Sequence, residues 1–212
     1  MRKFELWLDE SGDFNNDAQK TGNGANPSLV GGLLIENNTF PESYINAILP
    51  EVGTYHSVNE NDQLDRFKMI DERLYKNEAN RIVVFSNQEC IMILDNNLTY
   101  LNIISEGILQ LIKQLKAQYG EIFLRVIIAN RVNTTTRLNP VQSVLQSDEY
   151  VKRLKEKLLV ASLENSISDK EWALQTSSAR KDKRLMLADI ICNTFFTRYR
   201  RKKFNATERG YI

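Results

Sequence analysis

The apolar run Ile122–Ala129 (I-F-L-R-V-I-I-A) constrains the fold more than any other stretch of the chain. Only Arg125 interrupts it, so the run lacks the alternation of a strand with one solvated face. Such continuous strands are typical of parallel sheets that helices cover on both faces. The sequence therefore predicts that residues 122–129 form a central, parallel strand of an α/β sheet.

The remaining strands are predicted from shorter patterns. Phe4, Leu6 and Leu8 alternate with Glu5, Trp7 and Asp9, which is the period of a half-buried strand. A loop rich in Gly, Asn and Asp then leads to a second apolar stretch at residues 29–35, so the two strands are expected to form an antiparallel hairpin. Two more strands are predicted at residues 81–86 and 171–175.

Helical spacing of apolar residues marks most of the segments between these strands. The clearest helix runs from Leu101 to Leu115, with Gly120 placed to end it, and Pro140 is assigned to the loop that follows the apolar strand. The order of elements predicts a mixed sheet of about five strands with helices on its faces, in a single domain of residues 1–212. The other predicted helices cover residues 41–52, 63–75, 148–163 and 183–200.

Charge and composition exclude several classes of protein. The 28 Lys and Arg residues balance 27 Asp and Glu residues and leave a formal net charge of +1, so no global field indicates a nucleic-acid or membrane partner. No segment approaches the roughly 20 apolar residues that cross a bilayer, and the N-terminus has no signal-peptide core. We therefore expect no membrane contact. Cys90 and Cys192 each lie in an apolar run, where a thiol usually packs as a small apolar side chain, so we expect a reducing, cytoplasmic compartment.

The first strand ends on two adjacent carboxylates, in the stretch D-E-S-G-D that begins at Asp9. Asp9 and Glu10 have the hard oxygen ligands that Mg²⁺ and Mn²⁺ prefer, and Ser11 is expected to hold the turn. A calcium-binding EF-hand loop starting at Asp9 does not fit, because Phe14 and Lys20 occupy its glycine and glutamate positions. The alternative is an ordinary strand-to-loop turn in which Asp and Ser side chains bond their own backbone.

A further carboxylate, Asp189, lies in the last predicted helix, which is apolar nearly all round and is therefore expected to be buried. It shares a stripe with Leu185 and Cys192, where an unpaired carboxylate costs several kcal/mol unless something compensates it. A metal ion would compensate it. Two alternatives remain: Asp189 caps the N-terminus of the helix, or it pairs with Arg180 or Lys183.

These features together resemble a known family. A strand closing on D-E-S-G-D, a following G-G-L-L-I strand and an L-A-D-I-I helix are similar to the bacterial and phage family called domain of unknown function 3800. The resemblance covers most of the chain in element order, and its specific motifs are residues 8–13 and 187–191. It implies a ribonuclease-H-like fold and nuclease activity on RNA or DNA, with Asp9 and Asp189 meeting at Mg²⁺ or Mn²⁺. Glu10 is then a predicted catalytic residue that, like Glu106, would orient water or bind a second ion.

The resemblance also implies acids at two further positions. On the helix after the third strand the predicted catalytic residue and metal ligand is Glu106, although it projects with polar residues and a solvated glutamate is the alternative. At the end of the fourth strand, where such families often carry Asp, this chain has Asn130. An amide brings no charge, so a second ion would be held more weakly, and a non-catalytic binding module is the alternative function.

Substrate contacts are predicted at polar residues around these acids: Ser11, Asn130, Arg131 and His56, the single histidine. One histidine excludes a His-rich zinc site, and for His56 a surface or structural role is the alternative. The basic run R-Y-R-R-K-K at residues 198–203 is suited to a phosphate backbone, the alternative being a solvated helix end. The expected partner is nucleic acid.

Overall fold

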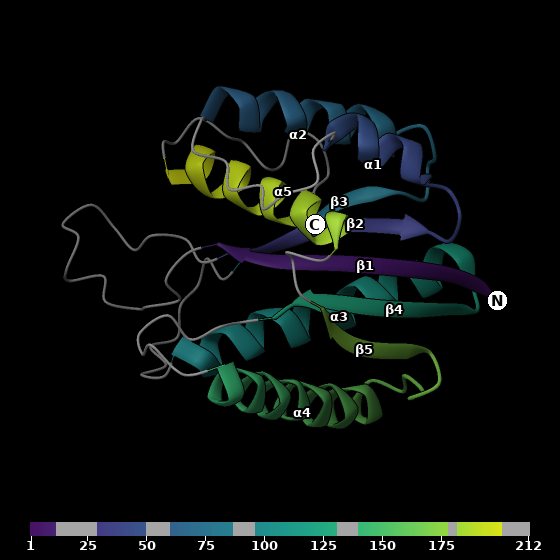
Figure 1. Cartoon of the computed structure of the whole chain (residues 1–212). Helices are drawn as coiled ribbons and strands as arrows, with labels where there is room; N and C mark the ends of the chain where they lie inside the picture. Colours follow the sequence, from purple (N-terminus) through teal and green to yellow (C-terminus); the bar gives the residue numbers. More distant parts are fainter. Residues whose placement is uncertain (12–28, 50–59, 87–95, 131–139, 178–181, 201–212) are drawn as a thin grey trace.

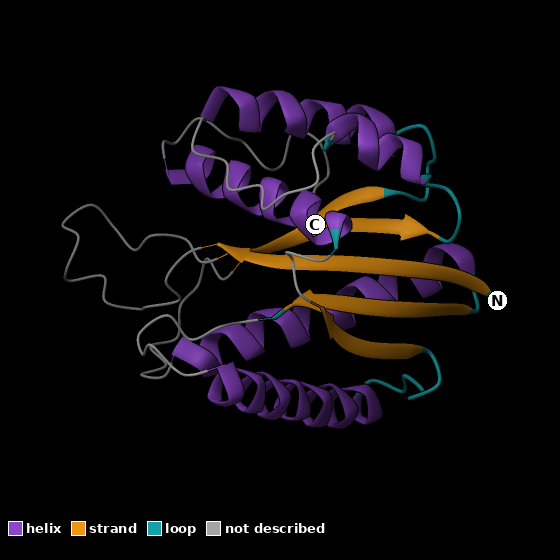
Figure 2. Cartoon of the chain, in the orientation of Figure 1, coloured by secondary structure: helices purple, strands orange, loops and turns teal. Residues whose placement is uncertain are grey.

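The computed structural model describes residues 1–11, 29–49, 60–86, 96–130, 140–177 and 182–200 (Figure 1). Strands and helices alternate through most of this part of the chain (Figure 2). In chain order the elements are β1 (Arg2–Ser11), β2 (Leu29–Glu36), α1 (Glu42–Ile48), α2 (Glu60–Leu74), β3 (Arg81–Ser86), α3 (Asn96–Tyr119), β4 (Ile122–Ala129), α4 (Pro140–Glu164), β5 (Trp172–Ser177) and α5 (Lys183–Arg200).

The strands form one mixed sheet in the order β3-β2-β1-β4-β5. β1 pairs antiparallel with β2, as the predicted hairpin requires, and parallel with β4. β2 pairs antiparallel with β3, and β4 pairs parallel with β5. The α/β, ribonuclease-H-like arrangement predicted from the sequence is confirmed, with helices in two layers around a five-stranded sheet (Figure 1).

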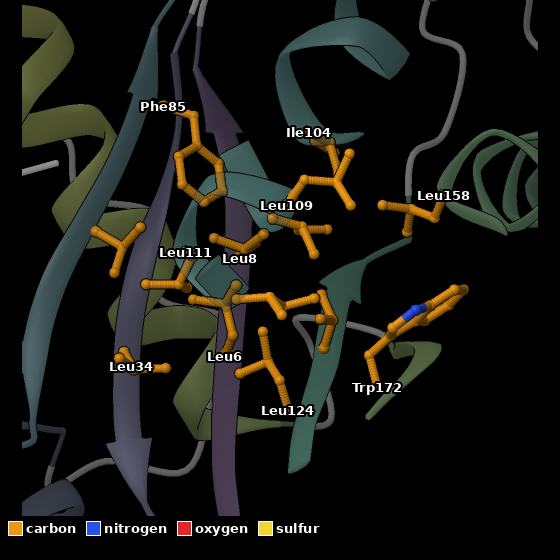
Figure 3. Packing of buried hydrophobic residues seen from close by; sticks show 14 of the residues in the cluster. Leu6, Leu8, Leu34, Phe85, Ile104, Leu109, Leu111, Leu124, Leu158 and Trp172 are labelled. Atoms are coloured by element: carbon orange, nitrogen blue, oxygen red, sulfur yellow. The ribbon is translucent and has the colours of Figure 1, made fainter. Parts of the chain in front are cut away.

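One face of the sheet packs against α3 and α4 (Figure 3). Because side chains alternate along a strand, Leu6 and Leu8 of β1 point to this face together with Leu124 of β4. They meet Ile104 of α3 and other fully buried apolar side chains. The predicted helix at residues 101–115 therefore supplies one half of the core, and it ends as expected before Gly120, whose φ is +76°.

The opposite face packs against α1, α2 and α5. α5 lies over β1 and β2, where Trp7 and Leu33 are buried beneath it. Ile127 of β4 is buried on this face, but Arg125 is exposed and donates to Gln175 Oε1 at 2.8 Å. The prediction that helices cover both faces of the whole β4 run is therefore wrong at Arg125, because the covering helix crosses the neighbouring strands.

Element boundaries differ most at the polar ends of helices. α4 begins at Pro140, so the assignment of this proline to a loop and the predicted start at Asp148 are wrong. Proline is favoured in the first turn, where its missing N–H would have no helical partner. α5 spans Lys183–Arg200, as predicted. Among the helices of the described ranges, none combines the length and hydropathy needed to traverse a bilayer.

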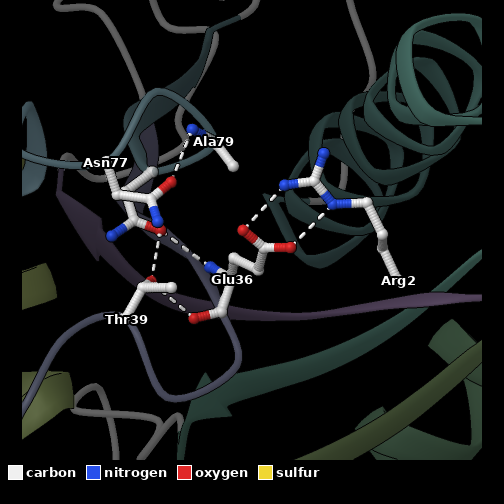
Figure 4. A network of polar contacts seen from close by, with 6 residues as sticks. Arg2, Glu36, Thr39, Asn77 and Ala79 are labelled. Atoms are coloured by element: carbon white, nitrogen blue, oxygen red, sulfur yellow. Dashed lines mark hydrogen bonds and ion pairs between the residues drawn. The ribbon is translucent and has the colours of Figure 1, made fainter.

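The amino end of β1 is held by an ion pair and neighbouring hydrogen bonds (Figure 4). The Arg2 guanidinium donates from Nε to Glu36 Oε1 at 2.6 Å and from Nη2 to Glu36 Oε2 at 2.7 Å. It also stacks over the Tyr119 ring, 4.0 Å from the centroid. Asn80 Oδ1 accepts hydrogen bonds from the Glu36 backbone N–H at 2.8 Å and from Thr39 Oγ1 at 2.9 Å.

Candidate functional site

Asp9 lies near the carboxyl end of β1, opposite Gly31 of β2. The strand alternation places it on the same face as Glu5 and Trp7, as the sequence predicted. The Trp7 indole N–H donates to Glu5 Oε2 at 3.2 Å, and the Trp7 ring is buried in the cluster beneath α5. Asp9 therefore faces the layer that contains the last helix.

The G-G pair of β2 allows α5 to approach the sheet closely. A Cβ atom at Gly32 would lie 1.7 Å from the carbonyl oxygen of Trp7 and 3.2 Å from the Cβ of Ala188. At Gly31 a Cβ would lie 3.3 Å from Cys192 Sγ. Two glycines on the strand and two small residues on the helix thus set a short separation between β2 and α5.

This close packing brings Asp189 to Asp9. Asp189 precedes Cys192 by one turn of α5, so the two side chains lie on neighbouring parts of one helix face. The Cys192 thiol donates to the carbonyl oxygen of Asp9 at 3.1 Å. Residues from the two ends of the chain therefore meet here, and the two carboxylates are near enough to interact electrostatically.

The two carboxylates repel each other in a site that is partly shielded from water. Burial, followed by the charge of Asp189, raises the pKa of Asp9 from 3.8 to about 8. The backbone N–H of Glu10 donates to Asp9 Oδ1 at 2.8 Å and opposes this increase. Burial, then the charges of Asp9 and Asp189, also raises the pKa of the Cys192 thiol well above its ordinary value.

The structure excludes one of the three interpretations of Asp189, the helix cap. α5 begins at Lys183, and Asp182 Oδ1 accepts a hydrogen bond from a backbone N–H two residues later at 3.0 Å. Asp182 therefore caps the helix, and the capping alternative for Asp189 is wrong. The Lys183 ammonium donates to Asn46 Oδ1 at 2.5 Å, while Arg180 lies outside the described residues.

Asn193 is a site residue that sequence reasoning missed. Its Nδ2 donates to Asp189 Oδ1 at 2.7 Å, and its Oδ1 accepts from Ser11 Oγ at 3.0 Å. Ser11 is buried, with 8% of its surface exposed, and it ties the end of β1 to α5. The four-residue spacing of Asp189 and Asn193 was the available signal, since such residues are neighbours on a helix surface.

Glu10 and Glu106 lie on the side of the sheet that α3 and α4 cover. Strand alternation directs Glu10 to the face that carries Phe85 and α3, away from the face of Asp9. Glu106 is exposed on α3. The structure therefore brings Asp9 to Asp189 on one side and places both glutamates on the opposite side, and a metal-binding role for Glu106 stays a prediction.

Asn130 follows β4 at the same end of the sheet. The parallel register aligns Leu8 with Ile128, so Asn130 lies two residues beyond the level of Leu8, with an exposed side chain. It thus shares the carboxyl edge of the two central strands with Asp9. The predicted substrate contacts His56 and Arg131 lie outside the described residues, as do residues 201–203 of the basic run.

The Asp9–Asp189 pair fits a hard divalent cation. Carboxylate oxygens are the preferred ligands of Mg²⁺ and Mn²⁺, and Mg²⁺ usually takes only one or two of them and completes its shell with water and substrate phosphate. Within the described ranges, no three or more His, Cys, Asp or Glu side chains form a group that could hold an ion. Two carboxylates are thus enough protein ligands for Mg²⁺ in an open site.

Comparisons with known proteins do not assign this chain to a family: no protein-family model matches it, and no curated protein does. The resemblance to the domain of unknown function 3800 family stays a prediction from the motifs at residues 8–13 and 187–191.

Proposed function

We propose that this protein is a Mg²⁺- or Mn²⁺-dependent nuclease that hydrolyses phosphodiester bonds of RNA or DNA. The observation that carries the proposal is the convergence of Asp9 on β1 with Asp189 on α5, although 180 residues separate them in the chain. The ribonuclease-H-like sheet supports it, because the pair lies at the carboxyl edge of the parallel strands, where ligands bind in open α/β sheets.

Asp9 and Asp189 would hold the cation through their carboxylate oxygens. A bound divalent ion stabilises the negative charge that develops on phosphate oxygens and activates a water molecule. The Glu10 backbone N–H fixes one oxygen of Asp9 from the strand side. Burial and the charge of Asp189 raise the pKa of Asp9, and a bound cation would relieve the repulsion between the two carboxylates.

Nucleic acid would approach along the same edge of the sheet. Asn130 lies there with an exposed amide, and Arg131 follows it directly in the sequence. Basic side chains near this edge would bind the phosphate backbone without distinguishing one nucleotide sequence from another. We place the reaction in a reducing, cytoplasmic compartment, in keeping with the buried free thiol of Cys192.

Labelled RNA and DNA incubated with the purified protein in Mg²⁺, Mn²⁺ or EDTA test the proposal. We expect cleavage that requires metal and that falls by roughly 100-fold or more in Asp9→Asn and in Asp189→Asn, the scale on which loss of one precisely placed active-site group acts. The matched control is Asp65→Asn, since Asp65 is an exposed carboxylate of α2 that pairs with Lys68. Intact substrates under every condition, or full activity of Asp9→Asn, would contradict the proposal.

The second candidate is a binding module of the same fold that does not cleave. The observation that favours it is Asn130, a neutral amide at the end of β4, where a further carboxylate would strengthen the hold on metal. This candidate predicts salt-sensitive binding of nucleic acid that persists in Asp9→Asn. It also predicts loss of binding when the four basic residues 200–203 are changed to Gln, measured by fluorescence anisotropy.

A further inference from the structure

Asn193 connects the two elements that carry the acidic pair. On α5 it lies one turn beyond Asp189 and donates to Asp189 Oδ1 at 2.7 Å. On the β1 side it accepts from Ser11 Oγ at 3.0 Å. Ser11 is two residues after Asp9, on the same face of the strand. The chain of contacts from Asp189 through Asn193 therefore returns to the strand of Asp9.

The chemistry of the partners fixes the orientation of the amide. An ionised carboxylate only accepts hydrogen bonds, so the NH₂ group of Asn193 must face Asp189. The carbonyl oxygen of the amide then faces Ser11, whose hydroxyl donates to it. An amide held at both ends has one arrangement, and this arrangement fixes one oxygen of Asp189 and the plane of its carboxylate.

We propose that Asn193 is a positioning residue of the metal site, which holds the carboxylate of Asp189 in the orientation for binding a divalent cation, with Ser11 as its anchor. This inference rests on the proposed function. On the same helix face, the Cys192 thiol binds the carbonyl oxygen of Asp9. α5 thus binds β1 through Cys192 and orients its own Asp189 through Asn193.

Groups that orient metal ligands typically change metal affinity or activity by about 10- to 100-fold when they are removed. The test measures the affinity of the metal-free protein for Mn²⁺ by calorimetry. Asn193→Leu keeps the branching at Cγ and the number of side-chain heavy atoms and removes both hydrogen bonds, so we expect Mn²⁺ affinity to fall by roughly 10-fold or more. Ser11→Ala removes only the anchor, and we expect a smaller loss of a few-fold.

The matched control is Asn165→Leu, the same substitution at an exposed asparagine after α4, whose amide accepts from Lys113. We expect its Mn²⁺ affinity to equal that of the wild type. The decisive comparison adds Asn193→Leu to Asp189→Asn. If Asn193 acts through Asp189, the double variant binds Mn²⁺ no more weakly than Asp189→Asn alone.

The outcomes separate this inference from the proposed function. A wild-type protein that binds no Mn²⁺ overturns both. Wild-type binding with an unchanged affinity in Asn193→Leu overturns the positioning role alone, as does an equal further loss in the Asp189→Asn background, which would indicate a general structural effect. If Asn193→Leu does not fold, Ser11→Ala decides, and unchanged Mn²⁺ affinity in that variant overturns the role.

Discussion

The two ends of β1 carry charge in opposite ways. At the amino end, Arg2 and Glu36 form a bidentate ion pair, and the hydrogen bond from Arg2 lowers the pKa of Glu36 (Figure 4). At the carboxyl end, Asp9 meets Asp189, and burial followed by repulsion raises the pKa of Asp9 to about 8. One strand thus begins at a neutralised pair and ends at two like charges.

This difference separates a charge that the fold neutralises from two acids that the fold brings together. Where the chain supplies its own counter-charge, the carboxylate needs nothing from outside. Where it packs two acids together, the folded state is less stable than it would be with neutral residues, and such sites are typical of binding and catalysis. The comparison therefore indicates that a cation bound at the Asp9 end would lower the repulsion between the two acids.

The largest effect on stability is expected from Asp9→Asn. The folded state favours neutral Asp9, so in metal-free wild type its contribution is complete below pH 3.8 and is lost as pH rises towards about 8. Within that window the free energy of unfolding should fall by up to about 1.4 kcal/mol per pH unit relative to Asp9→Asn. Urea unfolding in EDTA at several pH values measures the difference.

Asp65→Asn is the control for this experiment, because it removes an exposed carboxylate that pairs with Lys68. Its pH dependence should parallel that of the wild type. If the difference in free energy of unfolding between wild type and Asp9→Asn did not change with pH, the pKa of Asp9 would not be raised in the folded state. The contrast between the two ends of β1 would then be wrong.

The next largest effect is expected from Gly32→Ala, whose added Cβ would clash with the backbone of β1 at Trp7 and also press on Ala188 of α5. The added Cβ would lie 1.7 Å from a backbone oxygen, so the strand must shift, and overpacking of this kind costs typically about 1–3 kcal/mol. Gly31→Ala is the matched variant, with its Cβ 3.3 Å from the Cys192 sulfur, and should cost less. Equal urea midpoints for Gly32→Ala and wild type would disprove the close-packing argument.

Mn²⁺ should stabilise the folded protein only through the acids at the carboxyl end of β1. With Mn²⁺ at about 100 times its dissociation constant, the free energy of unfolding of the wild type should rise by about 2.7 kcal/mol. Asp9→Asn and Asp189→Asn should show little of this increase, while Glu36→Gln should retain it. Thermal and urea unfolding with and without Mn²⁺ measure the increase, and equal stabilisation of all four proteins would place the binding site elsewhere.

Much of the fold could be predicted because its signals are local. The run of β4 and the apolar surface of α5 reflect burial directly, and the hairpin follows from two apolar stretches around a polar loop. The importance of Asp189 could be seen for the same reason, since a carboxylate among buried side chains needs an explanation. These features depend on composition and spacing within one element.

The rest depends on how elements cross. Arg125 is exposed because α5 lies over β1 and β2, a choice that nothing within β4 reveals. Asn193 is a common polar residue inside a helix, and its contact with β1 becomes visible only when Ser11 is brought beside it. The same limit applies to Glu106, whose helix was predicted correctly but lies in the layer opposite to α5.

The smallest effect is expected from Glu36→Gln, and its sign is opposite to that of Asp9→Asn. The lowered pKa of Glu36 means that its ion pair contributes above pH 4.5 and is lost as pH falls through the lower folded value. The Arg2 side chain is 40% exposed, so solvent screens the pair and its loss should cost at most about 1 kcal/mol near neutral pH.

Urea unfolding of Glu36→Gln at neutral and acidic pH, in low and high salt, tests this last difference. The variant should be less stable than wild type at neutral pH and should approach it in acid and in high salt, because salt screens exposed pairs. Asp9→Asn should instead be more stable than wild type at neutral pH. If both variants shifted stability in the same direction, the two ends of β1 would share one electrostatic character, and the inference of an external cation at Asp9 would lose its basis.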